Sequence, residues 1–181
     1  MPLANNKNPN SAGFDSNGNY HIHYIPALGN KLFVLEGANR PDRLSGATQV
    51  TASADLSSLS NAGTLNVAAA DLATKDVSGV TMGFIQGVGG GAWAYRLSPT
   101  YEAKYIGSIF KAGSTGTLAQ SFGSMFTFNN EIYAAANNGD GVYKLHLDNF
   151  DFDNPSTVVF EYMGPSISTD GNDGMNCLNG K

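Results

Sequence analysis

A run of asparagine, glycine and aspartate in the second half of the chain constrains the fold more than any other feature. The run is NNGDG at residues 137–141, and a second asparagine pair stands at 129–130. These residues readily adopt the positive φ that tight hairpin turns require. Between the turns, residues 126–128 and 142–147 alternate between apolar and polar side chains, as half-buried strands do. Residues 126–167 therefore predict four short antiparallel strands in roughly 40 residues, the size of one propeller blade.

Weaker copies of this unit precede it. AYRL at 94–97 matches VYKL at 142–145, and KYIGSI at 104–109 matches EYMGPSI at 161–167, where Pro165 is the extra residue. NKLFV at 30–34 matches NEIYA at 130–134, and residues 80–84 hold the corresponding place in the middle copy. Starts near 31, 80 and 131 give a period of roughly 50 residues, within the range of blade repeats.

The predicted fold class is all-β and β-propeller-like, with about three to four four-stranded antiparallel blades. We expect an irregular lead-in at 1–13, then a single domain at 14–181 with blade-like units at about 14–60, 65–111 and 117–167 and a closing tail at 168–181. Alanines at 68–70 favour a helix over residues 65–72, whereas Val67 and the repeat phase favour the strand that we predict. Closed propellers usually have at least four blades, so we expect an incomplete or unusually small propeller, or one that is part of a larger chain.

Composition narrows the classes of function. Glycine is abundant at 22 of 181 residues and only 14% of residues are charged, which suits many short strands joined by tight turns. The net charge of −5 argues against nucleic acid, because phosphate binding needs a clustered basic face. No apolar stretch of about 18 residues predicts membrane insertion. The start, MPLANNK, has no apolar signal core, so a secreted origin requires that a signal was removed or that the chain is part of a larger one.

Carboxylates gather in three loops that are candidates for calcium. The leading candidate is the acidic loop with Asp148, Asp151 and Asp153. The other two are DSNGN at 15–19 and the pair Asp170 and Asp173. An EF-hand is excluded at 15–19, because Pro26 stands where the bidentate glutamate belongs. Solvated turns are the alternative at all three places.

Two histidines stand two residues apart in an alternating segment. His21 and His23 share one face of the predicted strand, as metal ligation requires, and His146 or an aspartate is a candidate third ligand. In the alternative interpretation, Tyr20, Ile22 and Tyr24 form the buried face and the histidines point to solvent.

Other patterns carry no catalytic assignment. GVGGGA at 87–92 fits a dinucleotide-binding glycine pattern, but Pro99 interrupts the helix that such a site needs and no acidic residue stands at 105–112. No GxSxG nucleophile motif occurs, so we expect no enzyme. Four residues are candidates for a sugar-binding face, with a core role as the alternative: Trp93, Tyr95, Arg96 and Glu102.

The strand and turn motifs of the last unit resemble a known family. NEIYAAANNGDGVYKL at 130–145, YMGPS at 162–166 and NDGMNC at 172–177 are similar to secreted β-propeller-like domains of large extracellular adhesion and surface proteins, including tubular-hair (mastigoneme) proteins of protists. The resemblance implies an extracellular module in which Cys177 pairs with a partner outside this chain. By itself, a lone cysteine leaves both an external disulfide and a free thiol open.

The expected function is a non-catalytic extracellular structural or interaction module that assembles into a filament, wall or matrix. Its expected partners are further copies of itself or other extracellular subunits. A calcium-dependent or carbohydrate-binding adhesion domain, with glycans as partners, is the alternative. A metal-dependent propeller enzyme that uses His21, His23 and His146 is the third candidate.

Overall fold

The computed structural model describes residues 11–23, 31–35, 50–55, 71–86, 91–96, 102–108, 110–111, 122–154 and 158–167. These residues form an all-β structure of three sheets, in which nearly all neighbouring strands are antiparallel. The described part of the chain contains no helix with the length and apolar character to cross a membrane.

Sheets 1 and 2 are four-stranded and take their strands in sequence order. Sheet 1 consists of β1 (Ser11–Phe14), β2 (Tyr20–His23), β3 (Lys31–Leu35) and β4 (Val50–Asp55). Sheet 2 consists of β5 (Leu72–Val77), β6 (Val80–Gln86), β7 (Gly91–Arg96) and β8 (Glu102–Ser108).

Sheet 3 repeats this arrangement and gains one short strand at its outer edge. Its sequential strands are β10 (Phe122–Phe128), β11 (Glu131–Ala136), β12 (Gly141–His146) and β13 (Val159–Gly164). The short strand β9 (Phe110–Lys111) runs parallel to β13. The parallel strand covers the edge of β13, which otherwise leaves backbone groups open to pairing.

The turns of sheet 3 explain why these residues form hairpins. Asn129 and Asn130 both have positive φ, of 50° and 57°, in the two-residue turn between β10 and β11. Between β11 and β12, Gly139 ends the 3-10 turn Asn137–Gly139 at a φ of 80°, and Gly141 opens β12 at a φ of 119°. The four-stranded unit predicted from the asparagine and glycine runs is therefore confirmed.

Three local expectations differ from the structure. Residues 11–13, expected in an irregular lead-in, belong to β1, because they pair with β2 across the turn at 15–19. The strand expected at 65–72 begins only at Leu72 and runs to Val77, and residues 65–70 lie outside the described part. Residues 110 and 111, expected at the end of the middle unit, form β9 and pair with β13 of sheet 3.

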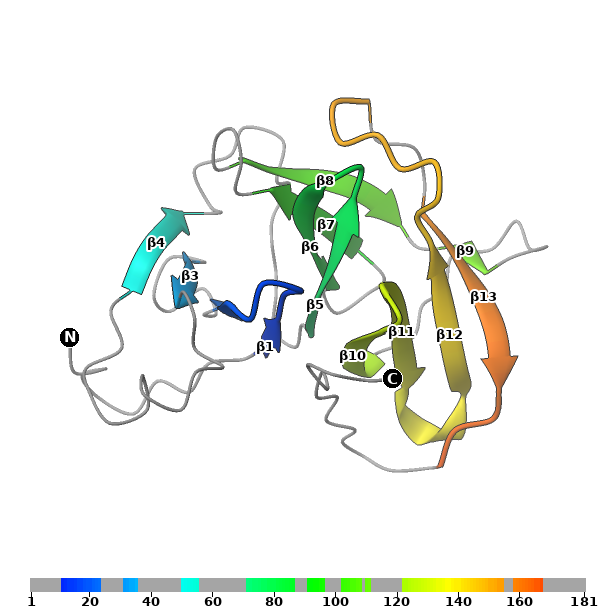
Figure 1. Cartoon of the computed structure of the whole chain (residues 1–181). Helices are drawn as coiled ribbons and strands as arrows, with labels where there is room; N and C mark the ends of the chain where they lie inside the picture. The colour runs from blue at the N-terminus through cyan, green and yellow to red at the C-terminus, as the bar shows by residue number, and fades with distance from the viewer. Residues whose placement is uncertain are drawn as a thin grey trace.

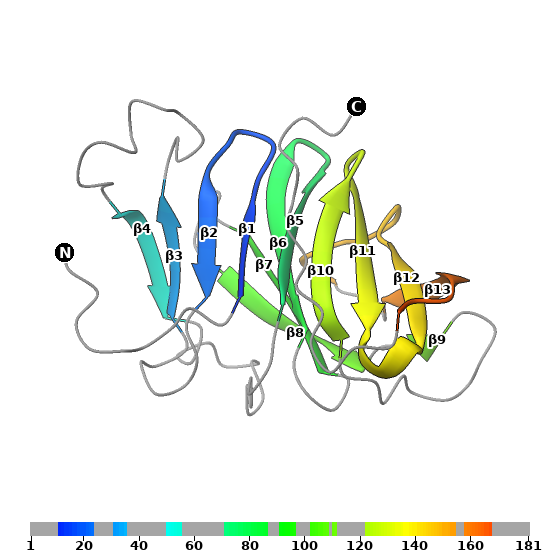
Figure 2. The ribbon, with the colours of Figure 1, turned by 90° about the horizontal axis from the view of Figure 1, so that it is seen from below.

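The first strands of the three sheets lie side by side, and the last strands point away from them. β5 contacts both β1 and β10. The outer strands β4, β8 and β13 lie at the left, top and right of Figure 1, so the sheets open like a fan from β1, β5 and β10. Figure 2 shows the inner strands as a row seen from below.

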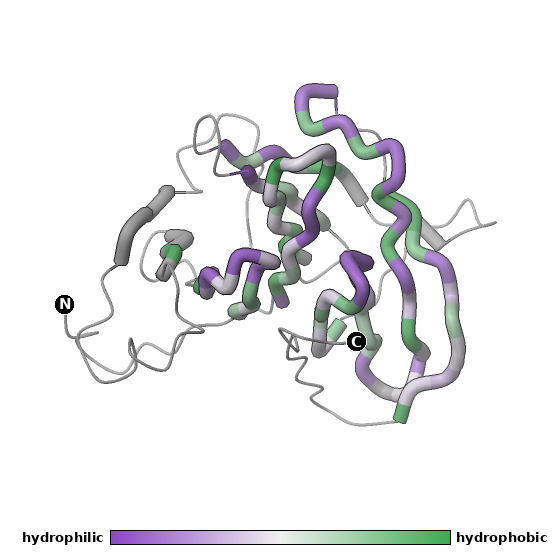
Figure 3. The backbone as a smooth tube through the Cα atoms, viewed as in Figure 1, coloured by the Kyte–Doolittle hydropathy of each residue, from purple (hydrophilic) through white to green (hydrophobic). Residues whose placement is uncertain are grey.

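The core cluster of the described residues lies between sheets 2 and 3. It combines the face of sheet 2 that carries Ala73, Phe84 and Ala94 with the face of sheet 3 that carries Ile132, Tyr143 and Phe160. Hydropathy alternates along these strands, as the changes between green and purple in Figure 3 show. Alternation with period two places every second side chain on one face of a sheet.

Strand pairing refines the repeat alignment. A register shift follows the pair Trp93–Tyr105 in sheet 2 and the pair Tyr143–Tyr162 in sheet 3. These bulges align Tyr105-Ile106-Gly107 with Tyr162-Met163-Gly164, in agreement with the sequence match of the last strand. The residue of sheet 2 that is structurally equivalent to Tyr143 is therefore Trp93 and not Tyr95. The sequence match of 94–97 to 142–145 is thus displaced by two residues from the structural alignment.

Candidate functional site

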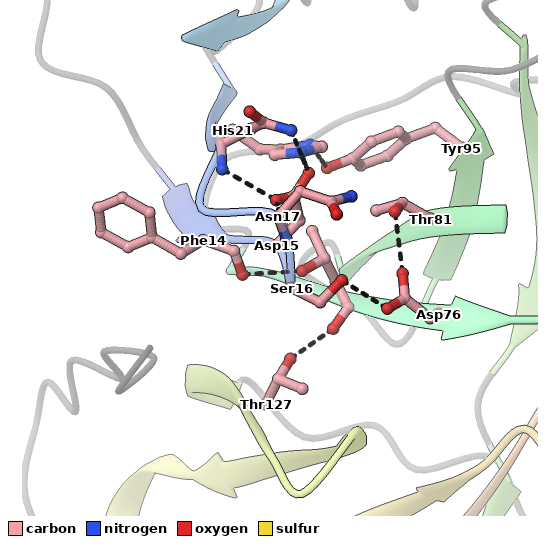
Figure 4. Close-up of polar contacts among 11 residues, drawn as sticks. Phe14, Asp15, Ser16, Asn17, His21, Asp76, Thr81, Tyr95 and Thr127 are labelled. Carbon is pink, nitrogen blue, oxygen red and sulfur yellow. Dashed lines mark hydrogen bonds and ion pairs between the residues drawn. The ribbon is translucent and has the colours of Figure 1, made fainter. Parts of the chain in front are cut away.

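A buried aspartate, histidine and tyrosine meet between sheets 1 and 2. Asp15 lies in the turn after β1, His21 in β2 and Tyr95 in β7 (Figure 4). Nδ1 of His21 lies 2.7 Å from the Tyr95 hydroxyl, and Nε2 lies 3.1 Å from Oδ2 of Asp15. This trio is the described cluster that most resembles a catalytic arrangement, since it places a carboxylate, an imidazole and a hydroxyl in one chain of hydrogen bonds.

The turn sequence DSNGN positions the Asp15 carboxylate. Oδ1 of Asp15 accepts hydrogen bonds from the backbone N–H groups of Asn17 and Asn19, both at 2.9 Å. Oδ2 accepts a third from the side-chain amide of Asn19, also at 2.9 Å. Gly18 supplies the positive φ of 79° that closes the turn. Aspartate commonly organises turns in this way, because its carboxylate bonds backbone groups two or more residues ahead.

Tyr95 reaches His21 because a glycine lies beneath its ring. Gly83 in β6 is the cross-strand partner of Tyr95. A Cβ atom at Gly83 would lie 1.8 Å from Cζ of Tyr95, a distance that real atoms do not tolerate. A glycine inside a strand often marks such a close approach. Here it lets the phenol ring lie across the sheet and direct its hydroxyl to sheet 1.

The surroundings of the trio shift the pKa values of Asp15 and Tyr95 in opposite directions. Burial acts to raise the pKa of Asp15, but hydrogen bonds from His21 and Asn19 outweigh it and lower the pKa below the ordinary value. Burial, and then the charge of Asp15, raises the pKa of Tyr95 well above its ordinary value, so the phenol keeps its proton. With a neutral imidazole, the Tyr95 hydroxyl donates to Nδ1 and the Nε2–H group donates to the Asp15 carboxylate.

The trio is sealed from solvent, and this decides what it can do. His21 is 0% exposed, Tyr95 1% and Asp15 4%. A substrate must touch the group that reacts, and a phenol with a raised pKa is a poor nucleophile. The arrangement therefore acts as a cross-link that joins the first turn and β2 of sheet 1 to β7 of sheet 2.

A second polar node joins the turns of all three sheets. Oδ1 of Asp76 in β5 accepts a hydrogen bond from the Thr81 hydroxyl at 2.9 Å, and Oδ2 accepts one from the Ser16 hydroxyl of sheet 1 (Figure 4). Its backbone N–H donates to Oδ1 of Asn130 at 2.9 Å, and its carbonyl accepts from Nδ2 of Asn130 at 3.1 Å. Asp76 thus connects the first turn of sheet 1 with the first turn of sheet 3.

Thr74, two residues earlier in β5, makes a parallel connection. Its hydroxyl donates to the Phe14 carbonyl of β1 at 2.8 Å, and its own carbonyl accepts from the Thr127 hydroxyl of β10 at 2.6 Å. The innermost strands are therefore tied through side chains as well as through packing.

An ion pair crosses from sheet 2 to sheet 3 beside these nodes. Nζ of the buried Lys75 lies 2.7 Å from Oε2 of Glu131, and Lys144 lies 3.4 Å from Oε1. Burial acts to raise the pKa of Glu131, but the hydrogen bond and charge of Lys75 and the charge of Lys144 lower it overall. The Glu131 carboxylate compensates the desolvation of the buried Lys75.

The acidic loop of sheet 3 attaches to sheet 2. Phe150 and Phe152 are buried, and Phe150 meets Phe84 edge to face at 5.3 Å. The Arg96 guanidinium lies 4.5 Å from the centre of the Phe152 ring and forms two hydrogen bonds with the Asp153 carboxylate, at 2.9 and 3.2 Å. The loop is thus a latch across the outer half of sheet 2.

The latch changes the interpretation of the leading calcium candidate. The Asp153 carboxylate pairs with Arg96 and Lys104. Oδ1 of Asp151 accepts the backbone N–H of Asp153 at 2.9 Å, and Asp148 lies on the surface. Among the described residues, no three or more histidine, cysteine, aspartate or glutamate side chains gather closely enough to hold a metal ion.

The histidine expectation was wrong about which face is buried. His21 is fully buried, whereas Tyr20 and Ile22, expected inside, are half-buried on the opposite face. The reason is the bond to Tyr95, which satisfies a histidine that alternation alone assigns to solvent. His146 lies in sheet 3 and pairs with Glu161 at 2.7 Å, so the structure does not bring it to His21. The side chain of His23 lies outside the described part.

The remaining predicted residues fall into three groups. Trp93 and Tyr95, proposed for a sugar-binding face, are buried, and Arg96 pairs with Glu102 at 2.6 Å. Residues 15–19 form the turn in which the Asp15 carboxylate already accepts hydrogen bonds from Asn17 and Asn19 and contacts His21. Asp170, Asp173 and Cys177 lie outside the described residues, so their roles stay predictions.

Comparison with known proteins adds no assignment. No protein-family model matches the sequence, and no curated protein matches it significantly. The site therefore rests on its geometry. Sequence reasoning missed Tyr95 as the partner of His21 and Gly83 as its support, although a glycine between Met82 and Phe84 in a strand is a signal for close approach.

Proposed function

We propose that this chain is a non-catalytic structural and interaction module, built as three blade-like units of a propeller. The observation that carries the proposal is the sealed trio of Asp15, His21 and Tyr95. The side chains best suited to chemistry are consumed in a contact between two sheets, where they hold a scaffold together. The fan of sheets around β1, β5 and β10 supports the propeller arrangement.

The module is proposed to work outside the cell, as a subunit of a filament, wall or matrix. The support is the resemblance of its turn and strand motifs to extracellular surface and adhesion domains, which also implies an external partner for Cys177. Fold alone does not supply function, so the proposal needs a direct test.

The test is fractionation of the native source without reductant, followed by gel filtration and mass spectrometry of the species that contains the chain. We expect a large species in the surface or matrix fraction that releases the chain when reductant is added. An intracellular monomer would refute the proposal. So would turnover of any substrate that is abolished by Tyr95→Phe in a variant that still folds.

A calcium-dependent adhesion domain is the second candidate. It draws on the exposed carboxylates of Asp148 and Asp151, because Arg96 and Lys104 hold the third member, Asp153. Titration calorimetry with calcium decides between the two. Binding that Asp148→Asn and Asp151→Asn remove would favour adhesion, and the absence of heat would favour the scaffold. A glycan array tests the carbohydrate version.

A further inference from the structure

The two ends of the fan each carry aromatic and aliphatic side chains on an outward face. In sheet 1, Gly13, His21 and Val34 share the face that meets sheet 2, as the bond from His21 to Tyr95 shows. Alternation places Tyr20 and Ile22 on the opposite face. We call this the leading face of sheet 1, and its described members are half-buried: Ala12, Phe14, Tyr20 and Ile22.

The opposite end is the face of sheet 3 that points away from sheet 2. Ile132, Tyr143 and Phe160 lie in the core between sheets 2 and 3, so alternation turns their neighbours outward. Phe126 and Tyr133 stack there with ring centres 5.6 Å apart. We call this the trailing face of sheet 3, and its apolar members are half-buried or exposed: Phe126, Phe128, Tyr133, Ala135, Val142, Val159 and Met163. The same face carries two ion pairs between its own strands, Lys144 with Glu131 and His146 with Glu161.

The interface between sheets 2 and 3 shows what covers such a face. The trailing face of sheet 2, with Met82, Phe84 and Ala94, packs on the leading face of sheet 3. Ile106, the bulge residue of β8, is 6% exposed in this interface. Met163 holds the same bulge position in β13 and is 52% exposed. The same structural position is thus buried by a following sheet in one unit and open in the next.

The leading face of sheet 1, at the other end of the fan, is a face of the kind that packs on a trailing face. Sheet 1 points left and sheet 3 points right in Figure 1, with sheet 2 between them, so the three sheets occupy one side of their common centre. A second copy turned by a half-turn about that centre brings its sheet 1 against sheet 3 of the first copy, and its sheet 3 against sheet 1. Two such contacts close without leaving an open end.

We propose that two copies of this chain associate head to tail, with the trailing face of sheet 3 of each packed on the leading face of sheet 1 of the other. The product is a closed ring of six sheets with twofold symmetry. This inference rests on the propeller arrangement proposed above. It also explains why both terminal sheets carry aromatic and aliphatic residues on their outward faces, as association surfaces do.

The test begins with light scattering behind gel filtration, on the full chain in the presence of reductant. We expect a mass of about 38 kDa, twice the 19.0 kDa of one chain. Met163→Lys on the trailing face and Ile22→Lys on the leading face should each give a monomer. Ile167→Lys is the matched control, because Ile167 is 81% exposed beyond the end of β13 and should leave the dimer intact.

Mixing the two monomeric variants separates this geometry from other dimers. A ring of one Met163→Lys chain and one Ile22→Lys chain carries both lysines at one contact and wild-type residues at the other. The mixture should therefore form a heterodimer, which a tag on one variant detects. In a dimer that pairs sheet 3 with sheet 3, or sheet 1 with sheet 1, the two variants would not both be monomeric alone and heterodimeric when mixed.

A monomeric wild-type chain at every concentration overturns the proposal, as does a dimer that both lysine variants leave intact or a mixture that stays monomeric. Circular dichroism and Trp93 fluorescence establish that each variant folds, and Tyr20→Lys replaces Ile22→Lys if that variant does not. Because reductant is present, this result is independent of any disulfide at Cys177. The scaffold proposal fails separately, through turnover or an intracellular location.

Discussion

Removal of one hydroxyl tests the role assigned to the buried trio. Tyr95→Phe keeps the aromatic ring over Gly83 but removes the O–H group that bonds Nδ1 of His21 at 2.7 Å. The imidazole nitrogen is 0% exposed with its residue, so water does not replace the lost partner. A buried polar group without a partner costs about 1–3 kcal/mol. A chain of this length loses about 2–4 °C in Tm per kcal/mol, so we expect a fall of roughly 2–12 °C.

The assay is urea unfolding followed by fluorescence of Trp93, the single tryptophan, which is buried in sheet 2. Tyr133→Phe is the matched control, because this half-buried tyrosine should change the free energy of unfolding by less than about 0.5 kcal/mol. The hydroxyl acts through His21, so Tyr95→Phe should cost far less in a His21→Leu background. An equal loss of unfolding free energy in both backgrounds, or no loss in the wild-type background, would refute the role of the trio as a cross-link.

Three further perturbations probe the same contacts. Gly83→Ala should destabilise by about 3 kcal/mol or more, because its Cβ would lie 1.8 Å from the Tyr95 ring; denaturant unfolding should show partial rescue by Tyr95→Leu. Asp15 has a lowered pKa in the folded protein, so its contribution to stability is present above the ordinary pKa of 3.8 and is lost as the pH falls through the folded pKa. Asp15→Asn should therefore flatten the acid limb of a plot of Tm against pH. An unchanged acid limb would contradict the assignment. Asp153→Asn should lower Tm slightly at low salt and less at high salt, since the Arg96 pair is exposed and screened; a salt-independent loss would contradict this.

The strands of sheet 3 were predictable because their signals are local. Alternation fixes the strand period, and asparagine or glycine at positive φ fixes the turns. Asn129, Asn130, Gly139 and Gly141 all adopt the backbone conformations for which such residues are selected. The matching of β8 to β13 also held, because the bulge after Tyr105 recurs after Tyr162.

The candidate site was less predictable because its partners are distant in sequence. His21 and Tyr95 are separated by 74 residues, and alternation cannot say which face of β2 is buried when both faces carry large side chains. The same limit explains the acidic loop. Its aspartates were visible as charges, but the burial of Phe150 and Phe152 depends on Phe84, Arg96 and Lys104 of another sheet.

The latch formed by the loop of sheet 3 has a consequence for biosynthesis. The outer half of sheet 2 is covered by Phe150 and Phe152, which leave the ribosome about 40 residues after β8 is complete. Until then, Phe84 and Arg96 lack the contacts that Phe150, Phe152 and Asp153 supply. Translation that stalls in this interval exposes an apolar surface to chaperones and to neighbouring nascent chains, and arrival of the loop removes it. The pace of synthesis between β8 and Asp153 thus sets how long the half-made protein is vulnerable.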